Sequence, residues 1–146
     1  MAEKYIKQID VRWADLDPNF HMLHSKYYDL GAYVRMCMFY DFGITADEIR
    51  TGGASPILFR EECSFRREIG FGDKVSIDAE LVKMKKDASR WTIRHQIMKG
   101  GDKLSATIVV DGAWIGLETR KLAIPPPSFI EAFSSFPKSQ DFQLID

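Results

Sequence analysis

Residues 24–42, HSKYYDLGAYVRMCMFYDF, predict a long helix that decides how the rest of the chain folds. Apolar side chains recur at three- and four-residue steps, which is the spacing of one helix face. This face consists of Tyr27, Leu30, Gly31, Val34, Cys37 and Met38. A second apolar set widens it, namely Tyr28, Ala32, Met36, Phe39 and Tyr40. We therefore expect the helix to be largely buried, and Gly43 suits its end because glycine tolerates the left-handed conformation found there.

Extended segments flank this helix on both sides. Residues 4–13 alternate apolar and polar side chains and predict a half-buried strand, whereas residues 14–23 contain Asp, Pro and Asn and predict a loop. After the helix, Thr45 with Glu48 three residues later forms a capping box, which predicts a short helix over residues 45–52. Four extended stretches follow, at about 55–69, 73–85, 89–99 and 103–116. Turn residues between them predict antiparallel hairpins, and hence a meander.

This order of elements predicts an α+β domain. The helix has to bury its broad apolar face, and the sheet is the only large apolar surface available to it, so we expect a curved antiparallel sheet wrapped around the helix. Part of the helix and one sheet edge stay uncovered, which favours self-association. We expect a single domain over residues 1–146, with a peripheral tail from about residue 126. Within that tail, 128–133 predicts a short helix and 134–146 a loosely held end.

Composition limits the possible functions. The chain has 146 residues, with 20 basic and 21 acidic side chains and no basic stripe, so we expect no nucleic-acid partner. No stretch approaches the ~18 apolar residues of a membrane span, and the first residues lack an apolar signal region, so we expect a cytoplasmic protein. Two cysteines, Cys37 and Cys63, are too few for a disulfide framework and suit small buried positions.

Histidines offer little sign of a metal. His21 and His24 have a His-x-x-His spacing, but a metal site would need at least one more ligand. His95 lies on a distant predicted strand, where we expect it to be half-buried. We therefore expect no metal.

The stretch VRWADLDPNFHMLHSKYY, residues 11–28, resembles the signature of the 4-hydroxybenzoyl-CoA thioesterase-like family. That family has an Asp-x-Asp loop, then a histidine, then an aromatic residue in its central helix. These features are matched here by Asp15, Asp17, His21 and Tyr27. Residues 62–73 and 101–120 also resemble the family, so that the likeness spans roughly residues 5–125. It implies a hotdog fold, in which a curved antiparallel sheet wraps around one long central helix.

The resemblance also implies a thioester hydrolase acting on acyl-CoA or an acyl-carrier-protein thioester. Asp17 would be the general base or the nucleophile that attacks the thioester carbonyl. Unpaired backbone N–H groups at the helix start, at His24 and Ser25, would stabilise the oxyanion. Coenzyme A would be part of the substrate, and no separate cofactor is expected. From the residues alone, the favoured interpretation is that Asp17 before Pro18 is a turn residue, since Asp-Pro is common in loops; the resemblance reverses that preference.

Other residues near the signature have alternative roles. We expect Asp15 to order the loop, and His21 either to do the same or to orient Asp17, because a neutral imidazole has one donor and one acceptor. Tyr27 is a candidate for binding substrate. Phe20 stands where the family commonly has glycine, and a bulky side chain there would narrow the site. Phe59, with Met36 and Phe39, is a candidate for setting the acyl-chain length.

Charged residues on the predicted strands allow two interpretations. Glu61 or Glu62 either faces the site or is an exposed strand carboxylate, and the second interpretation is favoured. Four arginines would suit the nucleotide end of coenzyme A, but cross-strand pairing with acidic neighbours is favoured. These arginines are Arg66, Arg67, Arg90 and Arg94.

Two alternative functions remain. A hotdog hydratase or dehydratase would pair His21 or His24 with Glu62. A non-catalytic acyl-binding module would explain why the bulky Phe20 stands where the family commonly has glycine. In each case we expect a homodimer or homotetramer.

Overall fold

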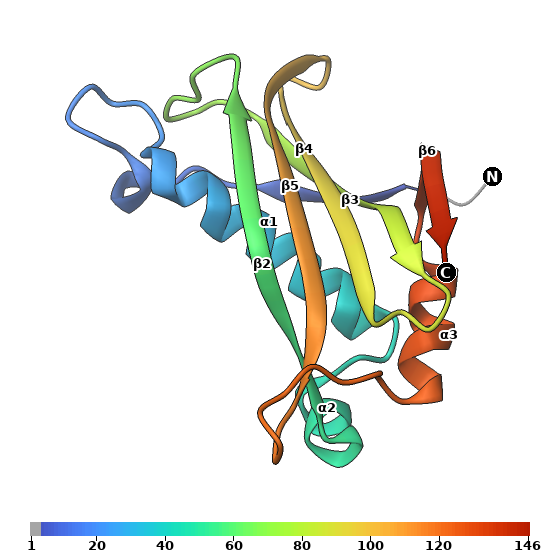
Figure 1. Cartoon of the computed structure of the whole chain (residues 1–146). Coiled ribbons are helices and arrows are strands. Elements are labelled where there is room, and N and C mark those ends of the chain that lie inside the picture. Colours follow the sequence, from blue (N-terminus) through green and yellow to red (C-terminus); the bar gives the residue numbers. More distant parts are fainter. Residues whose placement is uncertain (1–3) are drawn as a thin grey trace.

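A curved six-stranded sheet wraps around one long helix in the computed structural model, which describes residues 4–146 (Figure 1). The helices are α1 (His24–Asp41), α2 (Ala46–Gly52) and α3 (Pro127–Ser135), and a single 3-10 turn, η1, covers Trp13–Asp15. The strands are β1 (Tyr5–Ile9), β2 (Ala54–Phe65), β3 (Val75–Lys85), β4 (Arg90–Lys99), β5 (Lys103–Gly116) and β6 (Lys138–Ile145). The predicted α+β hotdog architecture is confirmed, as are the helices predicted at 24–42, 45–52 and 128–133.

The order of strands in the sheet differs from the predicted meander. It runs β1-β3-β4-β5-β2, so β2 pairs along its length with β5 and β1 lies next to β3. The hairpin expected between the second and third strands is therefore wrong, and residues 66–74 instead cross between opposite parts of the sheet. Glycines at 70 and 72 show that the chain turns there, but turn chemistry does not specify which strand becomes the neighbour.

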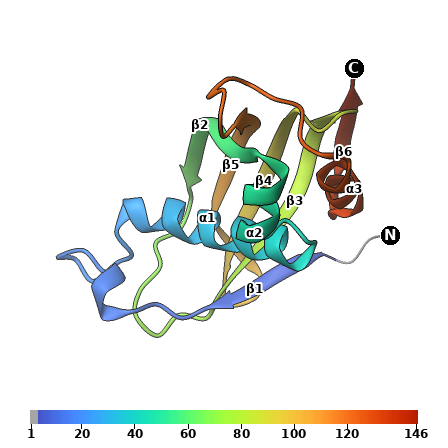
Figure 2. The ribbon, with the colours of Figure 1, turned by 90° about the horizontal axis from the view of Figure 1, so that it is seen from below.

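Only one face of α1 packs against the sheet. Gly31 lies so near β5 that a Cβ atom on it would sit 3.0 Å from Cδ1 of Ile108. Val34 and Met38 continue this buried face, whereas the opposite face of the helix stays in solvent. The large hydrophobic residues exposed there are Tyr33, Met36 and Tyr40. The expectation of a largely buried helix therefore holds for one face only, as Figure 2 shows, where the sheet covers one side of α1.

The C-terminal segment is part of the core, contrary to expectation. Phe129, Phe133 and Phe136 are fully buried, and the ring of Phe136 stacks on Phe39 of α1 with centroids 5.6 Å apart. The chain then forms β6, which runs parallel to the end of β3. The tail is neither peripheral nor loosely held, because its phenylalanines fill the core beside the C-terminal half of α1.

A buried polar cluster joins α1 to the sheet. His95 is 0% exposed instead of half-buried as expected. Its Nδ1 lies 2.9 Å from the carbonyl oxygen of Asp78, and its Nε2 lies 2.9 Å from Nη1 of Arg35. Because a carbonyl and an arginine are obligate acceptor and donor, the ring must be neutral, with its proton on Nδ1. Burial, and then the charge of Arg35, lower the pKa of His95 to about 3.

Asp78 titrates in the opposite sense. Burial raises the pKa of its carboxyl group to about 6, although Oδ1 accepts a hydrogen bond of 2.6 Å from the backbone N–H of Gln96. The two groups therefore have opposite effects on stability as the pH changes.

The cysteines are less buried than expected. Cys37 and Cys63 are both free and half-buried, and burial raises the pKa of the Cys63 thiol to about 11. Among residues 4–146, no helix has the length and apolar character needed to cross a bilayer.

We expect Phe136→Ala to lower the free energy of unfolding by about 3–5 kcal/mol, because it leaves a cavity in an aromatic core. Phe71→Ala removes the same ring from a site that is 68% exposed and should change stability by less than about 0.5 kcal/mol. Urea denaturation of both variants measures the difference. Equal effects would contradict the docking of the C-terminal segment.

Asp78→Asn and His95→Gln should change the slope of the free energy of unfolding against pH in opposite directions. The pKa of His95 is lowered, so its contribution is complete above its ordinary value of 6.5 and is lost as the pH falls towards about 3. The pKa of Asp78 is raised, so its contribution is complete below its ordinary value of 3.8 and is lost as the pH rises through about 6. Between about pH 4 and 6 the two contributions offset each other in the wild type.

Relative to the wild type, Asp78→Asn should lose stability on acidification below about pH 6, by up to about 1.4 kcal/mol per pH unit, because His95 then acts alone. His95→Gln should gain stability over the same range. Urea denaturation at several pH values between 4 and 7 tests this, and parallel profiles for all three proteins would contradict it.

Candidate functional site

The loop before α1 is held by Asp15, as expected for a residue that orders the loop. Its side chain is buried and accepts hydrogen bonds from the backbone N–H (2.9 Å) and the guanidinium Nη2 (2.8 Å) of Arg12. These bonds from Arg12 hold the pKa of Asp15 below its usual range. Its carbonyl accepts the N–H of Leu23 at 2.8 Å, so both ends of the loop are tied to one residue.

Asp17 lies half-buried inside this loop. Its Oδ1 accepts the backbone N–H groups of Asn19 at 2.8 Å and His21 at 3.2 Å. Asp17 therefore does act as a turn residue, and these two hydrogen bonds fix the orientation of its carboxylate. Among residues 4–146, no side chain or backbone group donates to the other oxygen, Oδ2, which remains available to a ligand or water.

A cavity of about 310 Å³ opens beside Asp17, and we call it the Asp17 pocket. It is formed where the loop, the start of α1 and the end of β2 meet. Its lining residues are Asp17, Met22, His24, Tyr27, Phe65, Arg66, Arg67 and Glu68. The structure thus brings together five of the residues singled out from the sequence, namely Asp17, His24, Tyr27, Arg66 and Arg67.

The start of α1 faces this pocket without a capping side chain. Leu23 occupies the cap position and cannot accept a hydrogen bond, and the first turn carries no acidic residue. The first amides of a helix lack intrahelical acceptors and carry partial positive charge. The N–H groups at His24 and Ser25 are therefore suited to an anionic oxygen.

His21 and Phe20 lie beside the pocket but do not line it. The imidazole Nδ1 of His21 is 3.3 Å from Oε2 of Glu68, so its side chain faces Glu68, while its backbone N–H orients Asp17. Phe20 is 62% exposed, packs against Trp13 with centroids 6.1 Å apart, and has a φ of +64°. A left-handed backbone explains why glycine would suit this position, and Phe20 adopts it with its ring pointing outward, not into the pocket.

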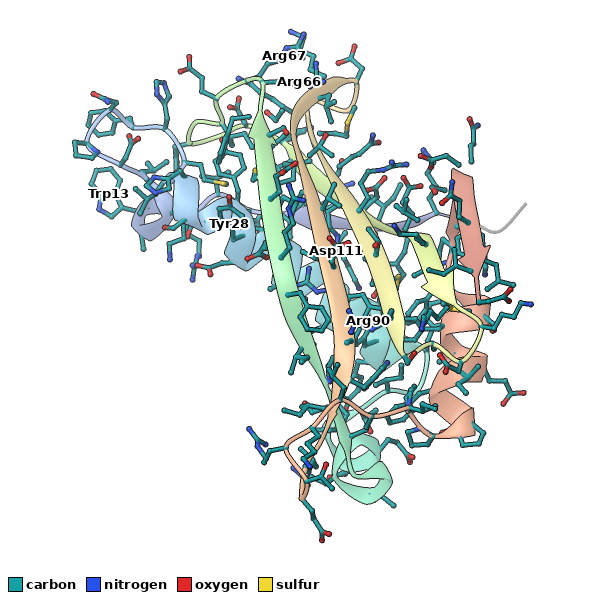
Figure 3. The ribbon with its side chains drawn as sticks, viewed as in Figure 1. Trp13, Tyr28, Arg66, Arg67, Arg90 and Asp111 are labelled. Carbon is teal, nitrogen blue, oxygen red and sulfur yellow. The ribbon has the colours of Figure 1, made fainter. Side chains whose placement is uncertain are left out.

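Glu62 and Phe59 lie apart from the Asp17 pocket. Glu62 is exposed and pairs with Arg60 at 2.5 Å, on the face of β2 that looks away from α1. Cζ of Arg90 lies 4.6 Å from the ring centroid of Phe59, and both residues line a separate hollow. Arg90 lies on the face of the sheet that looks away from α1 (Figure 3). No pair of His21 or His24 with Glu62 is therefore assembled.

The four arginines lie in different surroundings. Arg94 pairs with Glu80 at 2.9 Å, which confirms the favoured cross-strand interpretation for that residue. Arg66 and Arg67 lie at the end of β2, well away from Arg90 (Figure 3). They line both the Asp17 pocket and a neighbouring hollow of about 420 Å³. The other residues of this hollow are Glu68, Lys99 and Lys103.

Sequence reasoning missed three residues of the pocket. Met22 forms its buried floor, Glu68 positions His21, and Phe65 packs edge-on against Tyr27 with centroids 4.9 Å apart. Phe65 and Glu68 are in the second stretch of family resemblance, residues 62–73, which is the signal that would have found them. Their proximity to Asp17 depends on the backbone bond from Met22 N–H to the Ile69 carbonyl, 2.6 Å long.

Solved structures with this fold include several thioesterases. The hypothetical protein SAV2348 from Staphylococcus aureus, solved in complex with CoA, has a TM-score of 0.87 at 18% identity, over 96% of this chain and 90% of that one. Slr0204, a 1,4-dihydroxy-2-naphthoyl-CoA thioesterase from Synechocystis, has a TM-score of 0.80 at 16% identity, over 90% of this chain and 96% of that one. A DHNA-CoA thioesterase from Staphylococcus aureus has a TM-score of 0.78 at 19% identity, over 90% and 89%.

Comparison with curated proteins gives no match. The family model of the thioesterase-like superfamily, by contrast, matches residues 11–133, which include the loop, α1, the Asp17 pocket and most of the sheet. The match agrees with the resemblance noted in residues 11–28 and with the expected enzyme class. The chain belongs to the thioesterase-like superfamily.

Proposed function

We propose that this protein hydrolyses an acyl-CoA thioester, with Asp17 as the general base or nucleophile. One observation carries the proposal: an available carboxylate oxygen of Asp17 and the uncapped start of α1 line the same cavity. A carboxylate beside exposed helix amides supplies both parts that attack on a thioester carbonyl requires.

The reaction follows from this arrangement. The thioester carbonyl oxygen accepts the N–H groups at His24 and Ser25, which stabilise the negative charge that develops on it. As a general base, Asp17 removes a proton from water while the water oxygen bonds to the carbonyl carbon. The tetrahedral intermediate then expels the thiolate of coenzyme A, which takes up the proton, and leaves the free acid. As a nucleophile, Asp17 would instead form a mixed anhydride, which water hydrolyses.

The basic hollow beside the pocket supports coenzyme A as the carrier. Arg66, Arg67 and Lys103 offer positive charge next to the proposed position of the thioester. Arginine and lysine are the side chains that bind phosphate groups. SAV2348, the structural relative solved with CoA, supports the same substrate class.

The alternatives have less support. The expected hydratase arrangement, His21 or His24 with Glu62, is not assembled, because Glu62 pairs with Arg60 on the outer face of β2. Phe20, which favoured a non-catalytic binding module, points away from the cavity lining. A homodimer or homotetramer and a cytoplasmic location remain predictions. The exposed face of α1 and the edge strand β2 are the surfaces available for self-association.

Asp17→Asn should lower kcat for acyl-CoA hydrolysis by about 10²–10⁴-fold, because asparagine keeps the loop hydrogen bonds but cannot take a proton. Release of free thiol from a panel of acyl-CoAs measures the loss. Asp47→Asn, an exposed substitution on α2, is the matched control and should retain full activity. An Asp17→Asn variant with normal turnover would refute the mechanism.

Arg66→Gln should raise KM for an acyl-CoA by about tenfold, equivalent to about 1.4 kcal/mol of binding. It should leave kcat/KM unchanged for the same acyl group on N-acetylcysteamine, which lacks the nucleotide. Arg60→Gln, on the outer face of β2, serves as the control. If both thioesters respond equally to Arg66→Gln, the arginine does not bind the nucleotide end.

A further inference from the structure

Arg35 is a buried cation that the proposed chemistry does not use. It is 6% exposed, and its Nη1 donates to the neutral ring of His95 at 2.9 Å. Within residues 4–146, no carboxylate lies within 4.0 Å of its guanidinium, and Glu61 acts on it only through longer-range charge. Buried charges in proteins are normally paired, and an arginine has five donors, so most of its binding capacity is unfilled.

Arg35 lies on the face of α1 that also carries Tyr27, a residue of the Asp17 pocket. Tyr27, Gly31 and Arg35 are spaced four residues apart, so they form one line along the helix. Helical side chains point back towards the N-terminus, and His95, which Arg35 contacts, lies beside Gly31. The guanidinium is therefore close to the level of Gly31, about 10 Å along the axis from the first residue of α1.

The strand beside this line is left uncovered. Glu61, Cys63 and Phe65 face α1, because their partners on β5 are core residues. Phe65 is nevertheless 51% exposed, Cys63 is only half-buried and Glu61 is exposed. In Figure 1, β2 forms the sheet edge that passes across α1. An uncovered strip thus leads from Phe65, in the Asp17 pocket, along β2 towards Arg35.

We propose that Arg35 determines substrate specificity by binding a carboxylate on the acyl group of the thioester. The proposal rests on the function proposed above, which places the thioester carbonyl at the start of α1. An acyl chain running between α1 and β2 would then bring a terminal carboxylate to the guanidinium. His95 holds the guanidinium by one nitrogen without neutralising it, which leaves the planar fork free for a bidentate pair.

Matched acyl-CoAs test the proposal. Suberoyl-CoA and octanoyl-CoA have the same chain length and differ only in the terminal carboxylate, and adipoyl- and sebacoyl-CoA bracket that length. The wild type should prefer a dicarboxylic thioester over its monocarboxylic counterpart in kcat/KM by roughly 10- to 100-fold, the range of a charged hydrogen bond. Arg35→Met should abolish this preference by lowering kcat/KM for suberoyl-CoA far more than for octanoyl-CoA, and Arg35→Lys should keep part of it.

Arg90→Met, which removes an arginine from the outer face of the same sheet, is the control and should leave the preference intact. Equal turnover of both thioesters by the wild type would overturn the proposal, as would an equal loss for both in Arg35→Met. A pairing of Arg35 with a carboxylate of a second copy would also overturn it. That pairing would appear in sedimentation as dissociation of Arg35→Met with an unchanged substrate ratio.

Binding of free suberate and octanoate, measured by calorimetry, separates this proposal from the function on which it rests. If no thioester is hydrolysed but suberate binds the wild type more tightly than Arg35→Met, the hydrolase proposal fails and the anion site stands. If thioesters are hydrolysed but suberate and octanoate bind alike, the anion site fails alone. Thermal unfolding of each variant shows whether it is folded under the assay conditions.

Discussion

The close packing of one face of α1 against the concave side of the sheet is the constraint on which the molecule depends. Gly31 permits this approach, because any side chain there would press against Ile108 of β5. The sheet curves around the helix, and at the C-terminal half of α1 the phenylalanines of α3 complete the enclosure. The N-terminal half is left with its first turn at the surface, next to the loop that carries Asp17.

The candidate site is a consequence of that exposed first turn. A helix start that lacks a capping side chain would ordinarily reduce stability, so its retention beside a cavity suits a role in binding an anionic oxygen. The loop compensates through Asp15, which ties Arg12 and Leu23 together, and through the backbone bonds that orient the Asp17 carboxylate. These bonds hold the loop in place, whereas Oδ2 of Asp17 and the first amides of α1 are left without protein partners among residues 4–146.

Polar groups are also buried far from any loop, between α1 and β4. Arg35 and His95 meet because Gly31 lets the helix approach the sheet, and Asp78 fixes the tautomer of His95 through its backbone carbonyl. Such a cluster costs desolvation energy, and a core of apolar residues would pack equally well there. A charge kept at this position is more readily explained by what it binds than by what it stabilises.

Local patterns in the sequence determined the elements: the three- and four-residue periodicity of α1, the capping box at Thr45, the alternation of the strands, and the loop signature around Asp17. These features are short-range, since each depends on residues that are close together in the sequence. What only the tertiary structure decided was long-range: the pairing of β2 with β5, the docking of Phe136, the complete burial of His95, and the meeting of Glu68 with His21. Turn residues signal where a chain reverses but not which strand it joins, and burial depends on which surfaces finally meet, so neither can be obtained from neighbouring residues alone.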